Sequence, residues 1–314
     1  MADTVLITGA NGFIGSHTTL LMDSLGHKVI PTDVVPRSAD LSLLPIRSRS
    51  HLMNVTDAAA FRALCDNERP THIFHAAHPA RTEAPAVLNY CYHAMTNILE
   101  AAKEFGIKRV VYSSSASIYG QLKKPDHSRV KEDDAVTIYP TYFYRAAKTV
   151  SEWMGDFYKE KHGVDFVALR YSSVYGPGLY RSIPLELKKG ILGQPCRPFL
   201  TRVLDDPIYI DDVVDAVRRA LFSTKPLSRA YNIGLDQAYT SADLKRAIQK
   251  ALPDLSFEIG QHPNAAEVGP HRNRDPLDIS LAKRELEWVP KIYLEEGIAR
   301  VAKWLQENKS RLQI

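Results

Sequence analysis

Thr8–Gly15 reads TGANGFIG and follows directly on Thr4–Thr8, a short apolar run that predicts a β-strand. From about Phe13 to Leu25 the apolar residues recur at helical spacing, and a second apolar run spans His27–Asp33. A strand, a glycine-rich turn, a helix and a second strand form a βαβ unit. The glycines of such a turn allow a pyrophosphate to approach the backbone N–H groups at the start of the helix. The stretch therefore predicts a dinucleotide-binding site at the first strand.

Asp33 closes the second apolar run, where a carboxylate can accept hydrogen bonds from a ribose 2′-hydroxyl. The same negative charge repels a 2′-phosphate, so this residue favours NAD over NADP as the cofactor. The alternative is a solvated turn residue with no ligand. Arg37 follows closely in sequence, and its positive charge leaves some use of NADP open.

The alternation of strand and helix continues well beyond this unit. Further strands are predicted at His51–Val55, Thr71–Ala77, Arg109–Ser114 and Asp165–Tyr171, with helices at Ala86–Phe105 and Thr141–His162. Strands that alternate with helices predict an α/β fold with a doubly wound parallel sheet of the Rossmann type.

The chain becomes less regular after Tyr175, where glycines and prolines interrupt the pattern. A strand and a helix resume at Pro207–Val217, followed by a strand at Ala230–Ile233 and helices near Ser241–Leu252 and Leu294–Asn308. We expect residues 1–174 and 204–235 to form the dinucleotide-binding domain. Residues 175–203 and 236–314 are expected to form a smaller, discontinuous substrate-binding lobe.

The composition is that of an ordinary globular protein of 314 residues, with 45% hydrophobic and 24% charged residues. A formal net charge of +4 is too small to indicate nucleic acid or an anionic membrane as the main partner. No apolar run reaches the roughly 18 residues of a membrane span, and no signal-peptide pattern opens the sequence, so we expect a cytoplasmic protein. Three dispersed cysteines indicate neither disulfides nor a metal site.

Tyr144 and Lys148 are spaced i to i+4 near the start of a predicted helix, which places a phenol and an ammonium on one face. A nearby cation stabilises a phenolate, so the pair is a candidate for general acid–base chemistry. Pairs of this spacing also occur by chance, and a purely structural role is the alternative.

Hydroxyl side chains gather where the strand at Arg109–Ser114 ends, at Ser113, Ser114, Ser115 and Ser117. The carboxyl ends of parallel strands face the crevice in which ligands bind in such sheets. One of these hydroxyls could bind the substrate oxygen whose charge changes. The alternative is a polar strand end that caps its own backbone. A serine-hydrolase site is not indicated, because the G-x-S-x-G elbow is absent.

Together the glycine turn, the hydroxyl-rich strand end and the Tyr/Lys pair resemble the extended short-chain dehydrogenase/reductase family, in its NAD-dependent epimerase/dehydratase branch. Leu169–Pro177 is similar to the family's LRYFNVYGP segment, Pro207–Val213 to its strand-and-helix return, and Asp278–Leu286 to its C-terminal signature. The resemblance implies that Tyr144 is the general base and acid, that Lys148 holds the nicotinamide ribose, and that Ser115 completes the triad.

The resemblance also implies a set of cofactor contacts. Asp33 would hold the adenosine ribose, Asn54 and Val55 would flank the adenine, and the pyrophosphate would lie on Gly9, Gly12, Phe13, Ile14 and Gly15. The cofactor cleft would be lined by Ala76, Ala77, Ser113, Tyr144, Lys148 and Tyr171.

The family chemistry is hydride transfer between nicotinamide C4 and a carbon that bears a secondary alcohol. The chain lacks the Thr-Asp-Glu run of sugar 4,6-dehydratases, which leaves epimerisation or net oxidation and reduction. Asp205-Asp206-Pro207 replaces the family's Arg-Asp-Phe, and Asp205 would repel a diphosphate. Ser173 stands where the family usually has Asn, and together with Asp205 it disfavours a nucleoside-diphosphate substrate. Cys91 and Asn54 also depart from the family pattern, but the cofactor assignments tolerate these two changes, because backbone groups do much of that binding.

Candidate substrate contacts are Ser115, Ser117, His78, Arg81, Tyr144, Ser173 and Arg181, and an anion clamp could also draw on Arg202, Arg272 and Arg274. We expect an NAD-dependent oxidoreductase that acts on a sugar, sugar acid or polyol. A nucleotide-sugar 4-epimerase with retained NAD is the alternative, and a non-catalytic NAD-binding regulator is the third possibility. By analogy with the family we expect a homodimer packed through the helices at Ala86–Phe105 and Thr141–His162.

Overall fold

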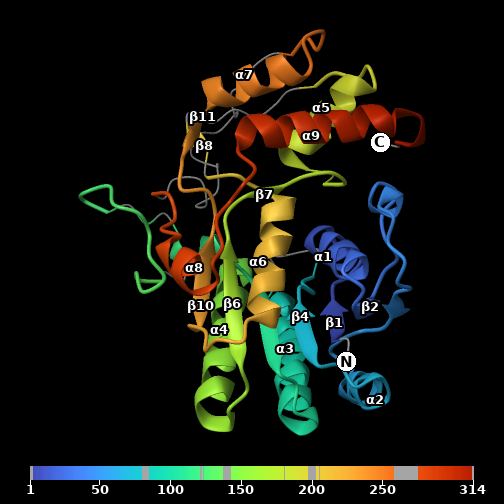
Figure 1. The fold of residues 1–314 in the computed structure, drawn as a ribbon, viewed down its shortest axis with the longest axis vertical. Helices are drawn as coiled ribbons and strands as arrows, with labels where there is room; N and C mark the ends of the chain where they lie inside the picture. Colours follow the sequence, from blue (N-terminus) through green and yellow to red (C-terminus); the bar gives the residue numbers. More distant parts are fainter. Residues whose placement is uncertain are drawn as a thin grey trace.

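The computed structural model describes residues 3–79, 85–120, 122, 124–136, 143–179, 181–196, 203–204, 206–257 and 275–312. Its main element is a seven-stranded sheet with the order β10-β6-β5-β4-β1-β2-β3, in which all paired strands run parallel (Figure 1). The predicted α/β fold with a doubly wound sheet is confirmed. The strands are β1 (Thr4–Thr8), β2 (Lys28–Asp33), β3 (His51–Leu52), β4 (His72–His75), β5 (Arg109–Ser115), β6 (Phe166–Tyr171) and β10 (Ala230–Ile233).

Alternate residues of a strand face opposite sides of the sheet, and β1 shows what each side contains. Val5 and Ile7 belong to the core that also holds residues of α1 (Phe13–Ser24) and α6 (Ile210–Phe222). Leu6 belongs to the other core, with residues of the three remaining flanking helices, α2 (Ala58–Glu68), α3 (Ala86–Phe105) and α4 (Phe143–His162). Both faces of the parallel sheet are therefore covered, as its apolar strands require.

Three further helices gather above the carboxyl end of the sheet in Figure 1, namely α5 (Ser182–Ile191), α7 (Ser241–Ala251) and α9 (Leu294–Glu307). Thr240 and Asp243 form a capping box that fixes the start of α7. A parallel pair, β7 (Val174–Tyr175) with β9 (Ile208–Tyr209), and an antiparallel pair, β8 (Val203–Leu204) with β11 (Tyr239–Thr240), connect these helices to the sheet. The remaining elements are α8 (Ser280–Glu285) and the 3-10 turns η1 (Leu41–Leu43), η2 (Ala116–Tyr119) and η3 (Lys309–Arg311).

A buried ion pair joins this upper group of helices to the first βαβ unit. The ammonium of Lys188 on α5 lies 2.6 Å from a carboxylate oxygen of Asp40, in the connection that follows β2. Leu41 packs against Gly178 in the same region. The predicted division into a dinucleotide-binding domain and a substrate lobe stays a proposal.

Two predicted strands extend beyond the carboxyl ends of the observed ones. β3 ends at Leu52 and not at Val55, because the side chain of Asn54 accepts a hydrogen bond from the Thr56 N–H and turns the chain. β4 ends at His75 and not at Ala77, because Ala76 and Ala77 leave the strand to pass against Gly9. The helix predicted at Ala86–Phe105 is observed with those bounds. α6 continues to Phe222, beyond the predicted end at Val217, and the predicted helix start at Thr141 lies outside the described residues.

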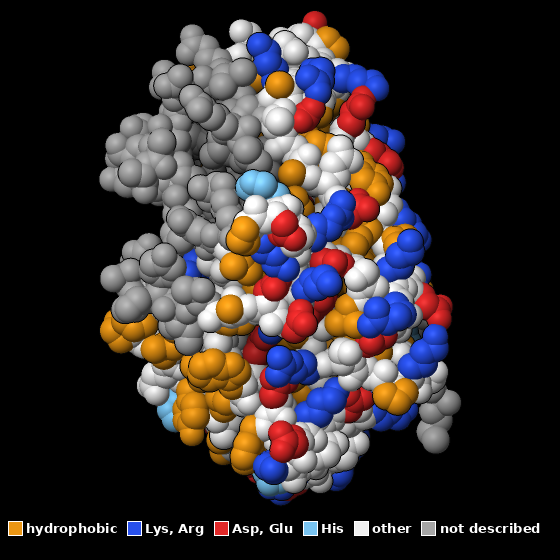
Figure 2. Space-filling model, turned by 90° about the vertical axis from the view of Figure 1, so that its left-hand side faces the viewer, with side chains coloured by type: hydrophobic (Ala, Val, Ile, Leu, Met, Phe, Trp, Pro, Cys, Tyr) orange, Lys and Arg blue, Asp and Glu red, His pale blue; other side chains and the backbone are white. Residues whose placement is uncertain are grey.

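The outer surfaces of α3 and α4 carry large apolar side chains. Tyr92 on α3 and Trp153 and Phe157 on α4 are each more than half exposed, at 51%, 58% and 54%. Figure 2 shows hydrophobic side chains gathered low on this face, at the level of these helices in Figure 1. No helix among the described residues is long and apolar enough to cross a membrane.

Candidate active site

The turn after β1 leaves no room for a side chain at Gly9 or at Gly15. Gly9 has a φ of +69°, and a Cβ there would lie 2.6 Å from the Ala77 backbone nitrogen. A Cβ on Gly15 would lie 2.0 Å from the Gly9 carbonyl oxygen. Gly12 provides no side-chain cap for α1, so the N–H groups of the first helical turn keep their capacity to bind an anion. This cradle fits the pyrophosphate of NAD.

Asp33 lies directly beside this turn. One carboxylate oxygen accepts a hydrogen bond from the Asn11 N–H at 2.9 Å, and the other accepts from the Val34 N–H at 2.7 Å. The carboxylate at the end of β2 is thus fixed in orientation, where a cofactor ribose would meet it. Ser50 was not predicted, yet its hydroxyl donates to the Asn11 side chain at 2.6 Å and receives a 3.3 Å bond from Arg37.

Lys148 is held at the end of β5 by contacts that leave it 3% exposed. Its ammonium donates to the Ser113 carbonyl at 2.6 Å. It also lies 4.9 Å from the ring centroid of Tyr112 and 5.6 Å from that of Tyr144. The structure therefore brings together the predicted pair and the predicted strand end. Ser115 is nearby in the chain, where its hydroxyl oxygen accepts from the Ser117 N–H at 3.2 Å.

Two histidines lie at the carboxyl end of β4, His75 as its last residue and His78 just after it. His75 is buried, bonds the Thr8 hydroxyl through Nδ1 at 2.6 Å and stacks on Tyr112 at 5.5 Å. His78 packs edge-to-face on Tyr144, with 4.8 Å between ring centroids. Burial, with a smaller contribution from the charge of Lys148, lowers the pKa of each to about 3, so both rings are neutral at physiological pH. His75 was not among the predicted site residues, since its partner Thr8 lies on a strand distant in sequence.

A buried ionic network supports α4 from beneath. Glu152 on α4 and Arg170 on β6 form an ion pair at 2.6 Å, with both side chains nearly fully buried. Ser114 donates to the same carboxylate, and Arg170 donates to the Tyr119 hydroxyl at 2.7 Å. Neither Glu152 nor Arg170 was among the predicted site residues. Arg170 could have been found from its position in the LRYSSVYGP segment, which matches a family motif. The network fixes α4 against the ends of the strands that carry the candidate catalytic residues.

The other predicted cofactor contacts lie at the carboxyl ends of neighbouring strands. Asn54 and Val55 follow β3, and the Val55 carbonyl accepts a hydrogen bond from Asn97 on α3 at 2.9 Å. Ala76 packs with Ala77 against Gly9, and Tyr171 is buried opposite Ser115 in the sheet register.

The predicted substrate contacts are less well assembled. Ser173 and Arg181 are exposed, and Arg181 precedes α5 with no side-chain cap bond. Asp206 is buried, and its carboxylate accepts from the Leu277 N–H at 3.3 Å. Arg81, Arg202, Asp205, Arg272 and Arg274 lie outside the described residues. Within the described part, no group of three or more His, Cys, Asp or Glu side chains could hold a metal ion.

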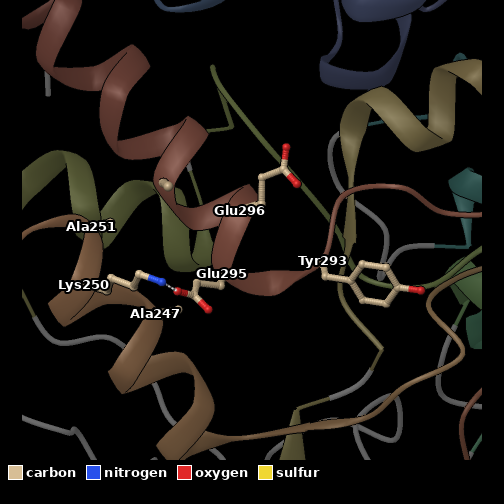
Figure 3. A pocket seen from close by; sticks show the side chains of 7 residues that line it. Ala247, Lys250, Ala251, Tyr293, Glu295 and Glu296 are labelled. Carbon is tan, nitrogen blue, oxygen red and sulfur yellow. Dashed lines mark ion pairs between the residues drawn. The ribbon is translucent and has the colours of Figure 1, made fainter.

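A surface cavity of about 520 Å³ lies elsewhere, between α7 and α9 (Figure 3). Lys250 and Glu295 form an ion pair at its edge, and Tyr293 and Glu296 also line it. None of the predicted site residues lines this cavity, so it is not the candidate active site.

Comparison with known proteins agrees with this geometry. The model of the NAD dependent epimerase/dehydratase family matches residues 5–234. A UDP-glucuronate 4-epimerase of Thermodesulfobacterium geofontis is 26% identical over 334 residues, which covers 96% of each chain. The structure of Thermus thermophilus UDP-glucose 4-epimerase with NAD superposes with a TM-score of 0.80 at 25% identity, covering 96% of this chain and 98% of that one. A partial consensus L-threonine 3-dehydrogenase has the same fold, with a TM-score of 0.80, 23% identity and coverage of 97% and 99%. The chain therefore belongs to the NAD-dependent epimerase/dehydratase family.

Proposed function

We propose that the protein catalyses net oxidation or reduction at a secondary alcohol or ketone of a sugar, sugar acid or polyol. Membership of the family makes the chain an enzyme that uses NAD. The proposal rests on the placement of Tyr144 and Lys148. The two lie on one face of α4, and Lys148 is bonded to the Ser113 carbonyl where β5 ends. A phenol and an ammonium are thereby placed at the edge of the sheet where ligands bind.

Each part of the site has a separate task in this proposal. The glycine turn holds the pyrophosphate, and Asp33 holds the adenosine ribose. When bound, NAD supplies the hydride acceptor or donor at nicotinamide C4. Tyr144 removes or returns the hydroxyl proton of the substrate, and Lys148 brings a positive charge to its ring. Ser115 binds the substrate oxygen whose charge changes during the reaction.

The acidic pair Asp205-Asp206 supports net redox chemistry over epimerisation of a nucleotide sugar. Asp206 is engaged with the backbone of Leu277, and Asp205 precedes it where family members grip a diphosphate with Arg. A carboxylate repels a diphosphate. The L-threonine 3-dehydrogenase with the same fold supports this proposal only at the level of the fold.

A nucleotide-sugar 4-epimerase with retained NAD is the second candidate. The UDP-glucuronate 4-epimerase that matches along nearly the whole chain favours it. The third possibility, a non-catalytic NAD-binding regulator, is set aside, because the members of the family are enzymes and Tyr144, Lys148 and Ser115 are all present.

Two further parts of the proposal concern substrate contacts and assembly. Ser117, His78, Arg81, Ser173 and Arg181 are proposed to contact the substrate. The exposed aromatic side chains of α3 and α4 support a homodimer packed through these helices, because large exposed apolar patches commonly mark interfaces. A cytoplasmic location also remains a prediction.

The test is the formation of NADH, followed by absorbance, when the purified protein and excess NAD meet separate pools of free sugars, sugar acids, polyols and nucleotide sugars. The proposal predicts stoichiometric NADH from a pool without nucleotides. A change of stereochemistry in a nucleotide sugar without net NADH would establish the epimerase instead.

A further inference from the structure

His78 carries an acceptor atom whose protonation state is fixed by its neighbour. Its Nδ1 lies 3.0 Å from the Pro79 carbonyl oxygen. A carbonyl oxygen can only accept, so Nδ1 carries the proton and donates it. In the neutral ring, Nε2 is then a bare acceptor. Because burial and the charge of Lys148 hold the pKa of His78 at about 3, Nε2 remains an acceptor at any pH at which the enzyme would work.

That acceptor is shielded from solvent and has no hydrogen-bond partner among the described residues. A buried polar atom without a partner costs free energy, and such atoms in native structures call for an explanation. The Ser117 hydroxyl is in the same condition. His78 follows β4 and Ser117 follows β5, and these strands are neighbours in the sheet. Two unpaired polar atoms therefore belong to segments that leave the same edge of the sheet.

The ring of His78 contacts the phenol that is proposed to react. Its ring lies edge-to-face on that of Tyr144, and Tyr144 is the residue proposed to take the substrate proton. A sugar or polyol carries a second hydroxyl on the carbon next to the one that reacts, at hydrogen-bonding distance from the first. A donor of this kind, brought in with the substrate, would pair with Nε2.

We propose that His78 is a specificity-determining residue whose Nε2 accepts a hydrogen bond from a second substrate hydroxyl, vicinal to the one that Tyr144 deprotonates. The substrate is therefore a vicinal diol and not an isolated secondary alcohol. This inference rests on the proposed function, because it needs Tyr144 at the reacting hydroxyl.

Two substitutions separate the acceptor from the ring. His78→Gln keeps an acceptor oxygen near the position of Nε2 and removes the aromatic ring. His78→Phe keeps a ring against Tyr144 and removes the acceptor. The probes are the pool compound that reduces NAD and its monodeoxy analogue, which lacks the vicinal hydroxyl. The readouts are kcat/KM for both probes, NADH affinity by fluorescence titration and the thermal unfolding midpoint.

The proposal predicts that His78→Phe lowers kcat/KM for the diol by roughly tenfold or more, while His78→Gln retains most of it. The wild type should discriminate against the deoxy analogue by a similar factor, and His78→Phe should not discriminate. A purely structural role gives the opposite order, with His78→Phe active and His78→Gln impaired, and overturns the proposal. Loss of NADH affinity in His78→Phe, with affinity retained in His78→Gln, overturns it too, because the donor to the acceptor atom would then belong to the cofactor.

Failure of the proposed function has a different signature. In that case wild-type protein reduces no NAD with any non-nucleotide pool, and the role of His78 falls with it. Failure of the inference alone leaves an active wild type that does not distinguish the diol from its deoxy analogue.

Discussion

The cofactor end and the reaction end of this site are built in different ways. At the cofactor end, after β1 and β2, the backbone forms the site, through the turn at Gly9 and Gly15 and the N–H groups that orient Asp33. At the reaction end, side chains from separate segments meet, as Lys148 and Tyr144 do with Ser113 and His78. A site made of backbone therefore lies within one short stretch of sequence, whereas a site made of side chains depends on the strand order.

The strongest way to break the cofactor end is to add one methyl group to its turn. In Gly15→Ala the new Cβ meets the Gly9 carbonyl oxygen at 2.0 Å and Ala10 Cα at 2.8 Å, and backbone atoms cannot rotate aside. We expect the Kd for NADH, measured by fluorescence titration, to rise by roughly a hundredfold. Gly12→Ala is the graded control, since its Cβ meets the same oxygen only at 3.2 Å. Wild-type affinity in Gly15→Ala would show that the turn does not hold the cofactor.

The ion pair between Asp40 and Lys188 joins the cofactor end to the helices above the sheet. Asp40→Asn leaves the buried ammonium of Lys188 without its counter-charge. We expect the free energy of unfolding to fall by about 3 kcal/mol in urea denaturation. The matched control is Glu287→Gln, which removes an exposed pair with Lys225 and should cost less than about 1 kcal/mol. An equal loss of unfolding free energy in the two variants would show that the Asp40–Lys188 pair does not stabilise the contact between the cofactor end and the helices above the sheet.

Prediction from the sequence was more complete for the cofactor end, which is built from backbone, than for the reaction end, which is built from side chains. The βαβ unit and the position of Asp33 are local properties, and the structure places both as predicted. The helix at Ala86–Phe105 was equally readable, because its apolar spacing and the glycine that follows lie together. The bond between Thr8 and His75 joins residues that are adjacent only because β4 pairs with β1. No local pattern contains that information.

The buried ionic network under α4 is a second feature that no local sequence pattern indicates. Neither Glu152 nor Arg170 was singled out from the sequence, since charged side chains are rarely buried without a partner. They are buried only because each supplies the other's counter-charge across α4 and β6. The substrate contacts are the least predictable part, since Arg181 is exposed at the start of α5 and several other candidates lie outside the described residues.

The charge of Asp33 is predicted to set the preference for NADH over NADPH at the adenosine ribose. Asp33→Asn keeps the size of the side chain and removes the charge that repels a 2′-phosphate. We expect the ratio of the NADPH and NADH dissociation constants to fall by about tenfold. Asp23→Asn is the control, because that carboxylate accepts from the Arg47 and Ser48 N–H groups and should leave the ratio unchanged. An unaltered ratio in Asp33→Asn would remove Asp33 from the cofactor site.

The last effect appears only on acidification and concerns the buried histidine that joins β4 to β1. Burial lowers the pKa of His75 to about 3 from an ordinary value of 6.5, so the neutral form is favoured in the folded state. Its stabilising contribution is complete above pH 6.5 and is lost as the pH falls from 6.5 toward 3. His75→Asn retains a partner for Thr8 and does not titrate. We expect the unfolding free energy of this variant to fall less steeply between pH 6.5 and 4, by at most about 1.4 kcal/mol per pH unit.

Urea denaturation at a series of pH values measures this slope. Above pH 7 the slopes of the wild type and the variant should coincide. A variant that follows the wild-type slope down to pH 4 would show that His75 does not contribute to acid unfolding.

The claim that Tyr144 transfers the substrate proton is tested by a single-turnover reduction of bound NAD in the wild type and in Tyr144→Phe. The substrate is the compound from the pools that reduces NAD with the wild type. NAD affinity is measured on the same samples. Tyr158→Phe is the matched control, since that phenol lies on the same helix and bonds Glu100 at the surface. We predict one equivalent of NADH from the wild type and the control, and none from Tyr144→Phe at unchanged NAD affinity. Reduction of NAD by Tyr144→Phe at the wild-type rate would contradict the account.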